Sequence, residues 1–319
     1  MWAPEPNMRD PATTGMAQFR KVRYRVPWGG RLPPVATVPP GVGSQRGAMS
    51  TRVRGATPAF GETKEYLGMD DTSIAASLAE EAGALLRELQ REAREEELGT
   101  AEFKDRGDRL SQSYLSRALA AKAAGDAVLS EEAVDDGARL HASRVWIIDP
   151  LDGTREFSEG RTDWAVHVAL WENGMLPAAA VALPGLDEVL TTSIAPKTWT
   201  RPDRIRLAVS RTRATPLVRA LADALNAEVV PMGSAGYKAC AVIRGEVDAY
   251  VHSGGQYEWD SAAPVAVARA AGLFTSRVDG SELRYNNVEP YLPDLIVCNP
   301  LIADELLRTV NELKEGALR

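Results

Sequence analysis

The sequence has little cysteine, no long apolar run and no excess of positive charge. Its two cysteines, Cys240 and Cys298, are too few and too far apart for a disulfide framework or a metal knuckle, and their apolar contexts predict reduced core residues. No run approaches the ~18 apolar residues of a membrane helix, and the N-terminus lacks the apolar region of a signal peptide. The net charge of −7 argues against a nucleic-acid-binding surface. We therefore expect a cytoplasmic protein that binds neither nucleic acid nor membrane.

Residues 1–68 differ in composition from the rest of the chain. They hold nine of the 20 prolines and ten Lys or Arg against four Asp or Glu, with no sustained apolar period. Such a segment cannot bury enough apolar surface to offset its chain entropy, so we predict a disordered, basic, proline-rich extension. A basic arm that touches RNA or membrane is the weaker alternative. The sequence from Met69 has the pattern of a folded domain, which favours Met69, or else Met49, as the translation start.

Residues 69–196 have the pattern of an α+β domain. Apolar residues recur at helical spacing from Thr72, and again after the segment DRGD at 105–108, which we expect to be a turn between two helices. Apolar and β-branched runs predict strands at 127–129, 145–148, 164–171 and 178–183. An antiparallel sheet packed against the two helices would satisfy this pattern.

Residues 197–319 alternate between strand and helix patterns. The expected strands lie at 205–209, 228–231, 247–251 and 295–298, and the expected helices at 216–225, 234–244 and 260–271. This alternation predicts a smaller α/β domain with partly parallel strand pairing. Ligands usually gather where the strands of such a layer end.

The segment VWIIDPLDGTREF at 145–157 concentrates the polar residues that suggest chemistry. An apolar strand ends on Asp149, and the next residue is a proline, which prevents regular continuation. Asp149 and Asp152 would repel each other here unless a cation lay between them, and hard oxygen ligands at this spacing suit Mg²⁺. The backbone N–H groups of Gly153 and Thr154 are candidates to receive a phosphate. A polar loop followed by a capped helix is the alternative interpretation.

Two further carboxylates lie at the ends of expected elements. Glu131 follows an expected strand, and Asp260 opens an expected helix. Alone, a Glu-Glu pair is usually a surface feature, and an Asp before a helix is usually an N-cap. Together with Asp149 and Asp152 these residues form an all-oxygen set without a histidine or thiolate ligand, which favours Mg²⁺ over zinc or copper.

Four motifs in order make the sequence resemble a known superfamily. The superfamily pattern is an upstream Asp, then EE, DPxDG[ST] and WDxA, and this chain has Asp108, Glu131-Glu132, DPLDGT at 149–154 and WDSA at 259–262. The chain thus resembles the lithium-sensitive, Mg²⁺-dependent phosphatases that include inositol monophosphatase, fructose-1,6-bisphosphatase and the bisphosphate nucleotidases. The actinobacterial, CysQ-type branch has segments similar to SEEA, VWIIDPLDGTREF, DWAVH, GSAG-x-KA and GGQYEWDSAAP. The resemblance covers nearly all of residues 70–319 and implies a layered αβαβα, sugar-phosphatase-like fold.

The resemblance also implies roles for the motif residues. The implied metal ligands are Glu131, Asp149, Asp152, Asp260 and the Leu151 carbonyl oxygen. Gly153 and Thr154 would offer backbone N–H groups to the scissile phosphate. The Thr154 hydroxyl would pair with Asp108 to orient and help deprotonate the attacking water, and Glu131 is counted with them as catalytic. The segment DRGD departs from the usual family pattern, and here Asp108 is preferred over Asp105.

Substrate contacts follow from less specific matches. The positions that correspond to the nucleotide surroundings in the bisphosphate nucleotidases are Ser210, Arg211, Ser234 and Lys238, and Asp260 is counted with them. Arg155 follows the phosphate loop and is a candidate for a phosphate contact or for an ion pair with a neighbouring acid. Tyr257 precedes Asp260 and is a candidate for contact with ribose or base, with a packing role as the alternative.

The function implied by the resemblance is that of a Mg²⁺-dependent 3′(2′),5′-bisphosphate nucleotidase. It would hydrolyse the 3′-phosphate of 3′-phosphoadenosine 5′-phosphate to leave AMP, which clears an inhibitory by-product of sulfate assimilation. Two or three Mg²⁺ ions, inhibition by Li⁺ and a homodimer are implied in the same way. Inositol 1-phosphate and fructose 1,6-bisphosphate are alternative substrates within the superfamily, and a non-catalytic phosphate-binding module is the alternative from another functional class.

Overall fold

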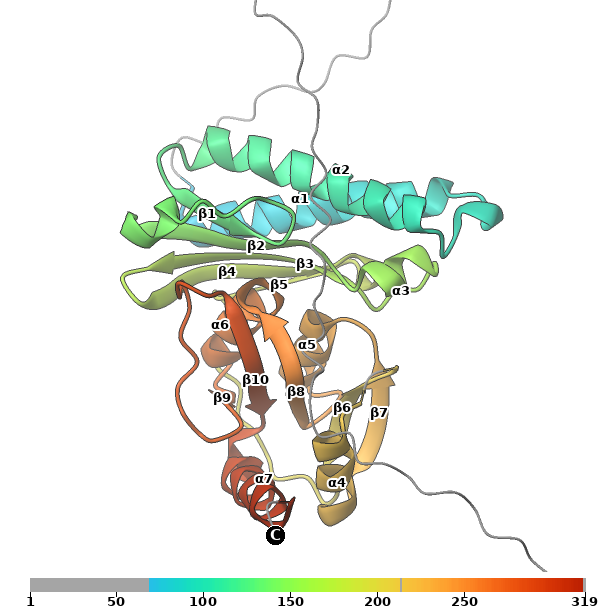
Figure 1. Ribbon diagram of the computed structural model, residues 1–319, viewed down its shortest axis with the longest axis vertical. Helices are drawn as coiled ribbons and strands as arrows, with labels where there is room; N and C mark the ends of the chain where they lie inside the picture. Colours follow the sequence, from blue (N-terminus) through green and yellow to red (C-terminus); the bar gives the residue numbers. More distant parts are fainter. Residues whose placement is uncertain (1–68, 213, 318–319) are drawn as a thin grey trace, which may run out of the picture. The chain divides into compact units, whose positions relative to one another are not determined.

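Two five-stranded sheets separated and flanked by helices make up the described part of the chain (Figure 1). The computed structural model describes residues 69–212 and 214–317, and these lie within one compact unit, Thr63–Arg319. The predicted disorder of residues 1–68 lies outside the described residues. The predicted domain boundary between residues 196 and 197 stays a prediction.

The layers alternate as helices, sheet, helices, sheet and helices (Figure 1). The helices, in order from outside the first sheet to outside the second, are α1 (Asp71–Glu92) and α2 (Ala101–Lys122), then α5 (Ala235–Arg244) and α6 (Ala262–Ala270), then α4 (Pro216–Ala224) and α7 (Ala303–Ala317). Three apolar clusters fill the spaces between these layers. The layered αβαβα prediction is therefore confirmed, although the sequence pattern did not predict α7.

The first helical layer agrees with the sequence pattern except at one segment. Asp70 caps α1 by accepting the Ser73 backbone N–H at 2.7 Å. The predicted turn at 105–108 is wrong, because these residues lie inside α2. Gly107 is buried there, and a Cβ at this position would lie 2.7 Å from a ring carbon of Phe157. The glycine therefore permits close packing of the helix and does not mark a turn.

The first sheet has the strand order β1-β2-β3-β4-β5. The strands are β1 (Ala127–Ser130), β2 (Arg144–Asp152), β3 (Ala165–Glu172), β4 (Met175–Leu183) and β5 (Glu188–Thr191). The predicted antiparallel pairing is correct for β2 to β4 but wrong for β1, which pairs parallel with β2. The reason is the connection through the short helix Ala138–His141, which makes a crossover instead of a hairpin. β5, which the sequence pattern did not predict, pairs antiparallel with β4. Near its end, β2 has an irregularity in register between Asp149 and Asp152.

The second sheet has the order β7-β6-β8-β10-β9. Its strands are β6 (Arg206–Ser210), β7 (Glu228–Met232), β8 (Ala249–Tyr257), β9 (Phe274–Ser276) and β10 (Tyr291–Cys298). β6 pairs parallel with β7 and β8, whereas β10 is antiparallel to β8 and β9. The predicted partly parallel layer is confirmed.

The interior contains both cysteines. Cys240 and Cys298 are buried free thiols, as predicted. Among the described helices, none combines the length and the apolar character that crossing a membrane requires.

The middle layer matters most for function, because the N-terminal ends of α5 and α6 meet the irregular end of β2 there.

Candidate active site

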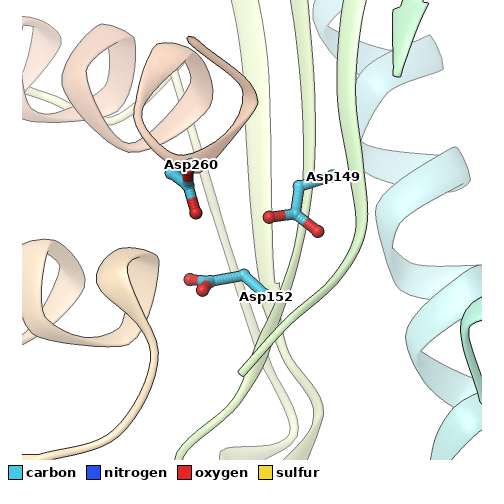
Figure 2. Close-up of side chains that lie close together, drawn as sticks. All are labelled: Asp149, Asp152 and Asp260. Carbon is cyan, nitrogen blue, oxygen red and sulfur yellow. The ribbon is translucent and has the colours of Figure 1, made fainter. Parts of the chain in front are cut away.

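Three aspartates meet between the first sheet and the middle helices. Asp149 and Asp152 lie at the end of β2, and Asp260 ends the short helix Glu258–Asp260 (η4) that leads into α6. Each offers a carboxylate oxygen, and these oxygens all lie within 4.8 Å of one another. Figure 2 shows Asp260 pointing toward the other two side chains across the space between the elements. The sequence pattern singled out all three, and the fold brings them together.

Two hydrogen bonds hold the irregular end of β2 around Pro150. The Ser111 hydroxyl of α2 donates to the Pro150 carbonyl oxygen at 2.6 Å. The Leu151 backbone N–H donates to Asp149 Oδ1 at 3.0 Å. Since Asp149 is only 1% exposed, these contacts orient its carboxylate in a site with little access to water.

The N-terminal turn of α5 binds the carboxylate of Asp152. The backbone N–H of Gly236 donates to Asp152 Oδ2 at 2.6 Å, that of Ala235 donates to Oδ1 at 3.1 Å, and the Ser234 hydroxyl donates to Oδ2. Burial alone would raise the pKa of Asp152, but the neighbouring His167 imidazole, the Ser234 hydroxyl and the Gly236 N–H together lower it to about 2. Asp152 is therefore ionised throughout the physiological pH range.

The other two aspartates are perturbed in the opposite direction. Burial, followed by the charges of Glu131 and Asp152, raises the pKa of Asp149 well above its ordinary value. Burial and the charge of Asp152 raise the pKa of Asp260 to about 6, even though Asp260 Oδ2 accepts the Tyr257 backbone N–H at 2.6 Å. These carboxyl groups repel each other in a poorly solvated space. A divalent cation among them would remove that repulsion, and an all-carboxylate donor set fits Mg²⁺.

Glu131 lies near this group but does not belong to the close set of three. It follows β1 directly, and much of the residue is exposed to solvent. Its carboxyl group nevertheless faces the acidic site: desolvation, then the charges of Asp260, Glu132 and Asp108, raises its pKa to about 8. Its assignment as a metal ligand stays a prediction.

Asp108 and Thr154 are brought together as the resemblance implied. Thr154 Oγ1 lies 3.5 Å from Asp108 Oδ1 and 3.1 Å from the Leu151 carbonyl oxygen. Burial, then the charges of Glu132 and Asp105, raises the pKa of Asp108 to about 7. Asp105, by contrast, is exposed and lies 3.9 Å from Arg109 of the same helix. The geometry favours Asp108 over Asp105, while the catalytic role of the Asp108–Thr154 pair and the metal-ligand role of the Leu151 carbonyl stay predictions.

Gly153 adopts a left-handed conformation with φ +89° between the two parts of the motif. A Cβ at this position would lie 3.0 Å from the Ser234 Cβ and 3.2 Å from the Trp164 Cβ. Both the backbone angle and the close approach therefore require glycine. The predicted phosphate contact of the Gly153 and Thr154 N–H groups stays a prediction.

The residues predicted to contact substrate have protein partners in this structure. Lys238 is buried, and its Nζ donates to the carbonyl oxygens of Gly233 and Ser234. Arg211, which follows Ser210 of β6, donates to Glu156 at 3.1 Å and to Glu159 at 2.7 Å. Arg155 is exposed and lies 3.3 Å from the Thr212 hydroxyl. Lys238 thus supports the N-terminal turn of α5, and the predicted substrate contacts of Ser210, Arg211, Ser234, Lys238 and Arg155 stay predictions.

Two features of the site were not predicted from the sequence. The first is the pair of backbone N–H groups at Ala235 and Gly236, for which a carboxylate partner cannot be read from sequence. The second is His167, which is fully buried in β3 with Nε2 3.3 Å from Asp152 Oδ2. A signal for His167 exists, because a histidine within an apolar strand next to an acidic strand end is unusual.

Two layered sheets with a carboxylate centre suited to a divalent cation between them are typical of the metal-dependent sugar phosphatases. The chain belongs to the inositol monophosphatase family, because residues 70–315 match the sequence model of that family. It is 49% identical over 262 residues to the 3′-phosphoadenosine 5′-phosphate phosphatase of Mycobacterium leprae, which covers 77% of this chain and 95% of that protein. It is also 33% identical over 166 residues to the Escherichia coli 3′(2′),5′-bisphosphate nucleotidase CysQ, covering 48% of this chain and 67% of the relative.

Solved structures agree with this family assignment. The crystal structure of CysQ from Bacteroides thetaiotaomicron is 26% identical, with a TM-score of 0.64 over 71% of this chain and 96% of that chain. A Thermotoga maritima IMPase also has a TM-score of 0.64, over 78% of this chain and 99% of that chain. At 24% identity, the second likeness concerns the fold alone.

Proposed function

We propose that this chain is a Mg²⁺-dependent 3′(2′),5′-bisphosphate nucleotidase that hydrolyses 3′-phosphoadenosine 5′-phosphate to AMP and phosphate. The main support is the cluster of Asp149, Asp152 and Asp260, assembled in a chain about half identical to mycobacterial phosphatases named for that substrate. In the reaction, water attacks the 3′-phosphorus, the bond from phosphorus to the ribose 3′-oxygen breaks, and that oxygen takes up a proton.

Divalent cations bound at these carboxylates would lower the pKa of water, neutralise the phosphate and stabilise the leaving oxygen. Asp149, Asp152 and Asp260 would hold them, with Glu131 and the Leu151 carbonyl completing the set. Asp108 would accept the proton of the attacking water through the Thr154 hydroxyl, since the pKa of Asp108 is raised to about 7. The N–H groups of Gly153 and Thr154 would bind the phosphate oxygens. No covalent phospho-enzyme is required.

The nucleoside part of the substrate has a candidate contact at Tyr257. The Tyr257 ring stacks on Trp259 with centroids 4.7 Å apart and planes at 8°, and it remains 43% exposed. Its backbone N–H binds Asp260, so the aromatic pair adjoins the metal centre. The Tyr291 ring also meets Tyr257, with centroids 5.9 Å apart and planes at 81°. The exposed part of the Tyr257 ring would contact the base, because every base has a flat face for stacking.

A substrate panel tests the assignment. Turnover of 3′-phosphoadenosine 5′-phosphate, inositol 1-phosphate and fructose 1,6-bisphosphate should be compared at the same Mg²⁺ concentration. We expect the highest kcat/KM for the nucleotide, and a value no better than that for inositol 1-phosphate would overturn the substrate assignment.

A second pair of variants separates an enzyme from a phosphate-binding module. Asp152→Asn should abolish Mg²⁺-stimulated phosphate release, whereas Asp187→Asn should leave it unchanged, because Asp187 lies in an exposed ion pair with Arg87. Phosphate release that is independent of Mg²⁺, or that survives Asp152→Asn, would contradict metal-dependent catalysis at this site.

Mg²⁺ as the particular cation, two or three ions per chain, and inhibition by Li⁺ belong to the same proposal. Li⁺ also prefers oxygen ligands but carries half the charge of Mg²⁺, so it would occupy a site without activating it. Activity unchanged at millimolar Li⁺ would count against this part. A homodimer in the cytoplasm, without nucleic-acid or membrane partners, completes the proposal, and analytical ultracentrifugation would test the dimer.

A further inference from the structure

His167 connects the two parts of the metal centre. It lies in β3, in register with Asp149 of β2, and its side chain is fully buried. Its Nδ1 lies 3.0 Å from the carbonyl oxygen of Trp259, 92 residues along the chain. A carbonyl oxygen only accepts hydrogen bonds, so Nδ1 carries the proton and donates it. The segment held in this way is the one that immediately precedes Asp260.

The opposite edge of the imidazole faces Asp152. His167 Nε2 lies 3.3 Å from Asp152 Oδ2 and forms no hydrogen bond of good geometry within the described residues. Gly236 packs directly against this edge, since a Cβ there would lie 1.9 Å from Nε2. The imidazole therefore fills the space bounded by the end of β2, the start of α5 and η4.

This position differs from that of an ordinary packing residue. The three aspartates come from two segments of the chain, and their mutual repulsion would push those segments apart. His167 makes a hydrogen bond to the segment of Asp260 and a close contact with Asp152, while its Nδ1 lies 4.0 Å from Asp149 Oδ2. Groups of this kind behind metal ligands typically change metal affinity about 10- to 100-fold when they are removed.

We propose that His167 is a positioning residue of the metal centre. Its Nδ1–H holds the Trp259 carbonyl, its Nε2 edge packs against Asp152, and the imidazole thereby sets the distance between Asp260 and the Asp149–Asp152 pair. In this role His167 would act through Trp259 and Asp152, without binding the cation or the substrate itself. This inference rests on the metal site of the proposed function but is independent of which phosphate ester is hydrolysed.

Calorimetric titration of Mg²⁺ into substrate-free protein tests the proposal. His167→Leu fills a similar volume without either contact and should weaken Mg²⁺ binding about 10- to 100-fold. His167→Asn keeps a donor near the Nδ1 position and should bind Mg²⁺ within about threefold of the native affinity, whereas His167→Gln, whose amide reaches the Nε2 position, should recover less. Because no substrate is present, a wrong substrate assignment would leave these results unchanged.

Val168→Ala is the matched control. Val168 is the next residue in β3, is equally buried and belongs to the apolar cluster on the opposite face of the sheet. This variant should lower Tm while Mg²⁺ affinity stays within twofold. The proposal would be overturned by a folded His167→Leu protein with native Mg²⁺ affinity, or by a Val168→Ala protein that loses as much affinity. If His167→Leu fails to fold, an Asn variant that binds Mg²⁺ as weakly as the Gln variant would overturn the link through Trp259.

Discussion

The backbone N–H of Gly236 donates to Asp152 Oδ2 at 2.6 Å, although the two residues are 84 positions apart. This hydrogen bond joins the first turn of α5 to the end of β2, and so joins the second half of the chain to the acidic motif of the first. It also helps to keep Asp152 ionised beside two carboxyl groups whose pKa values are raised. The site therefore depends on the packing of the middle layer as much as on its ligands.

Gly236→Ala should destabilise the protein. The added methyl group would lie 1.9 Å from His167 Nε2, and His167 is fully buried and unable to move aside freely. Overpacking of this kind costs about 1–3 kcal/mol, which corresponds to a Tm lowered by roughly 2–12 °C in a domain of this size. Gly316→Ala is the control, because nothing lies within 4 Å of a Cβ at that helical position. A native Tm for Gly236→Ala would contradict the close approach of α5 to β3.

Thr154→Val and Asp108→Asn should each lower kcat by about 10²–10⁴-fold, because proton transfer from the attacking water would lose its acceptor. Neither change should alter Mg²⁺ affinity by more than a few-fold, which calorimetry would establish alongside the rate of phosphate release. Asp105→Asn is the control, since its exposed contact with Arg109 at 3.9 Å contributes little. A loss of rate in Asp105→Asn equal to that in Asp108→Asn would reverse the assignment of the pair.

The Tm of the metal-free protein should fall as the pH rises from about 5 to about 8. The folded-state pKa values are about 6 for Asp260, 7 for Asp108 and 8 for Glu131, against ordinary values of 3.8 and 4.5. The folded protein thus binds more protons than the unfolded chain in this window, so stability decreases with pH. Asp152 acts in the opposite sense, but only below its ordinary pKa of 3.8.

Mg²⁺ should reverse this trend, because it binds the deprotonated carboxylates and releases their protons. Differential scanning fluorimetry in EDTA or in saturating Mg²⁺ would measure both effects, and the gain in Tm on adding Mg²⁺ should grow from pH 6 to pH 8. Asp149→Asn, which removes one of the repelling charges, should flatten the slope in EDTA. A metal-free Tm that rises with pH over this range would contradict the crowding of the carboxyl groups.

Tyr257→Leu should reduce kcat/KM for the nucleotide about 5- to 150-fold, the equivalent of roughly 1–3 kcal/mol of base stacking. Turnover of inositol 1-phosphate, which has no base, should change by less than twofold. Met175→Ala is the control, because Met175 is an exposed apolar residue at the start of β4. An equal loss on both substrates would mean that the Tyr257 ring positions the Asp260 segment by stacking on Trp259 and does not select the base.

Local patterns in the sequence were enough to predict most of the layers and the nature of the site. Helical periodicity from Thr72, the alternation of strands and helices after residue 196, and an all-oxygen set of acidic residues all depend on neighbours along the chain. The prediction of a turn at DRGD was wrong because Gly107 permits close packing of α2 against Phe157, and this contact joins residues that are distant in the chain. The prediction of antiparallel pairing for β1 was wrong for a related reason, because the direction in which β1 pairs depends on the path of the connection that follows it.

Asp149, Asp152 and Asp260 could be identified as candidate ligands from the sequence alone, because a carboxylate after an apolar strand or before a helix can be recognised locally. Three features could be seen only in the folded chain. The oxygens of the three aspartates meet within 4.8 Å, α5 donates two backbone N–H groups to Asp152, and His167 lies behind the site. The physical reason is that each of these contacts joins segments that are distant in the chain. Such contacts are selected by the burial of whole layers against one another, and no local pattern encodes them.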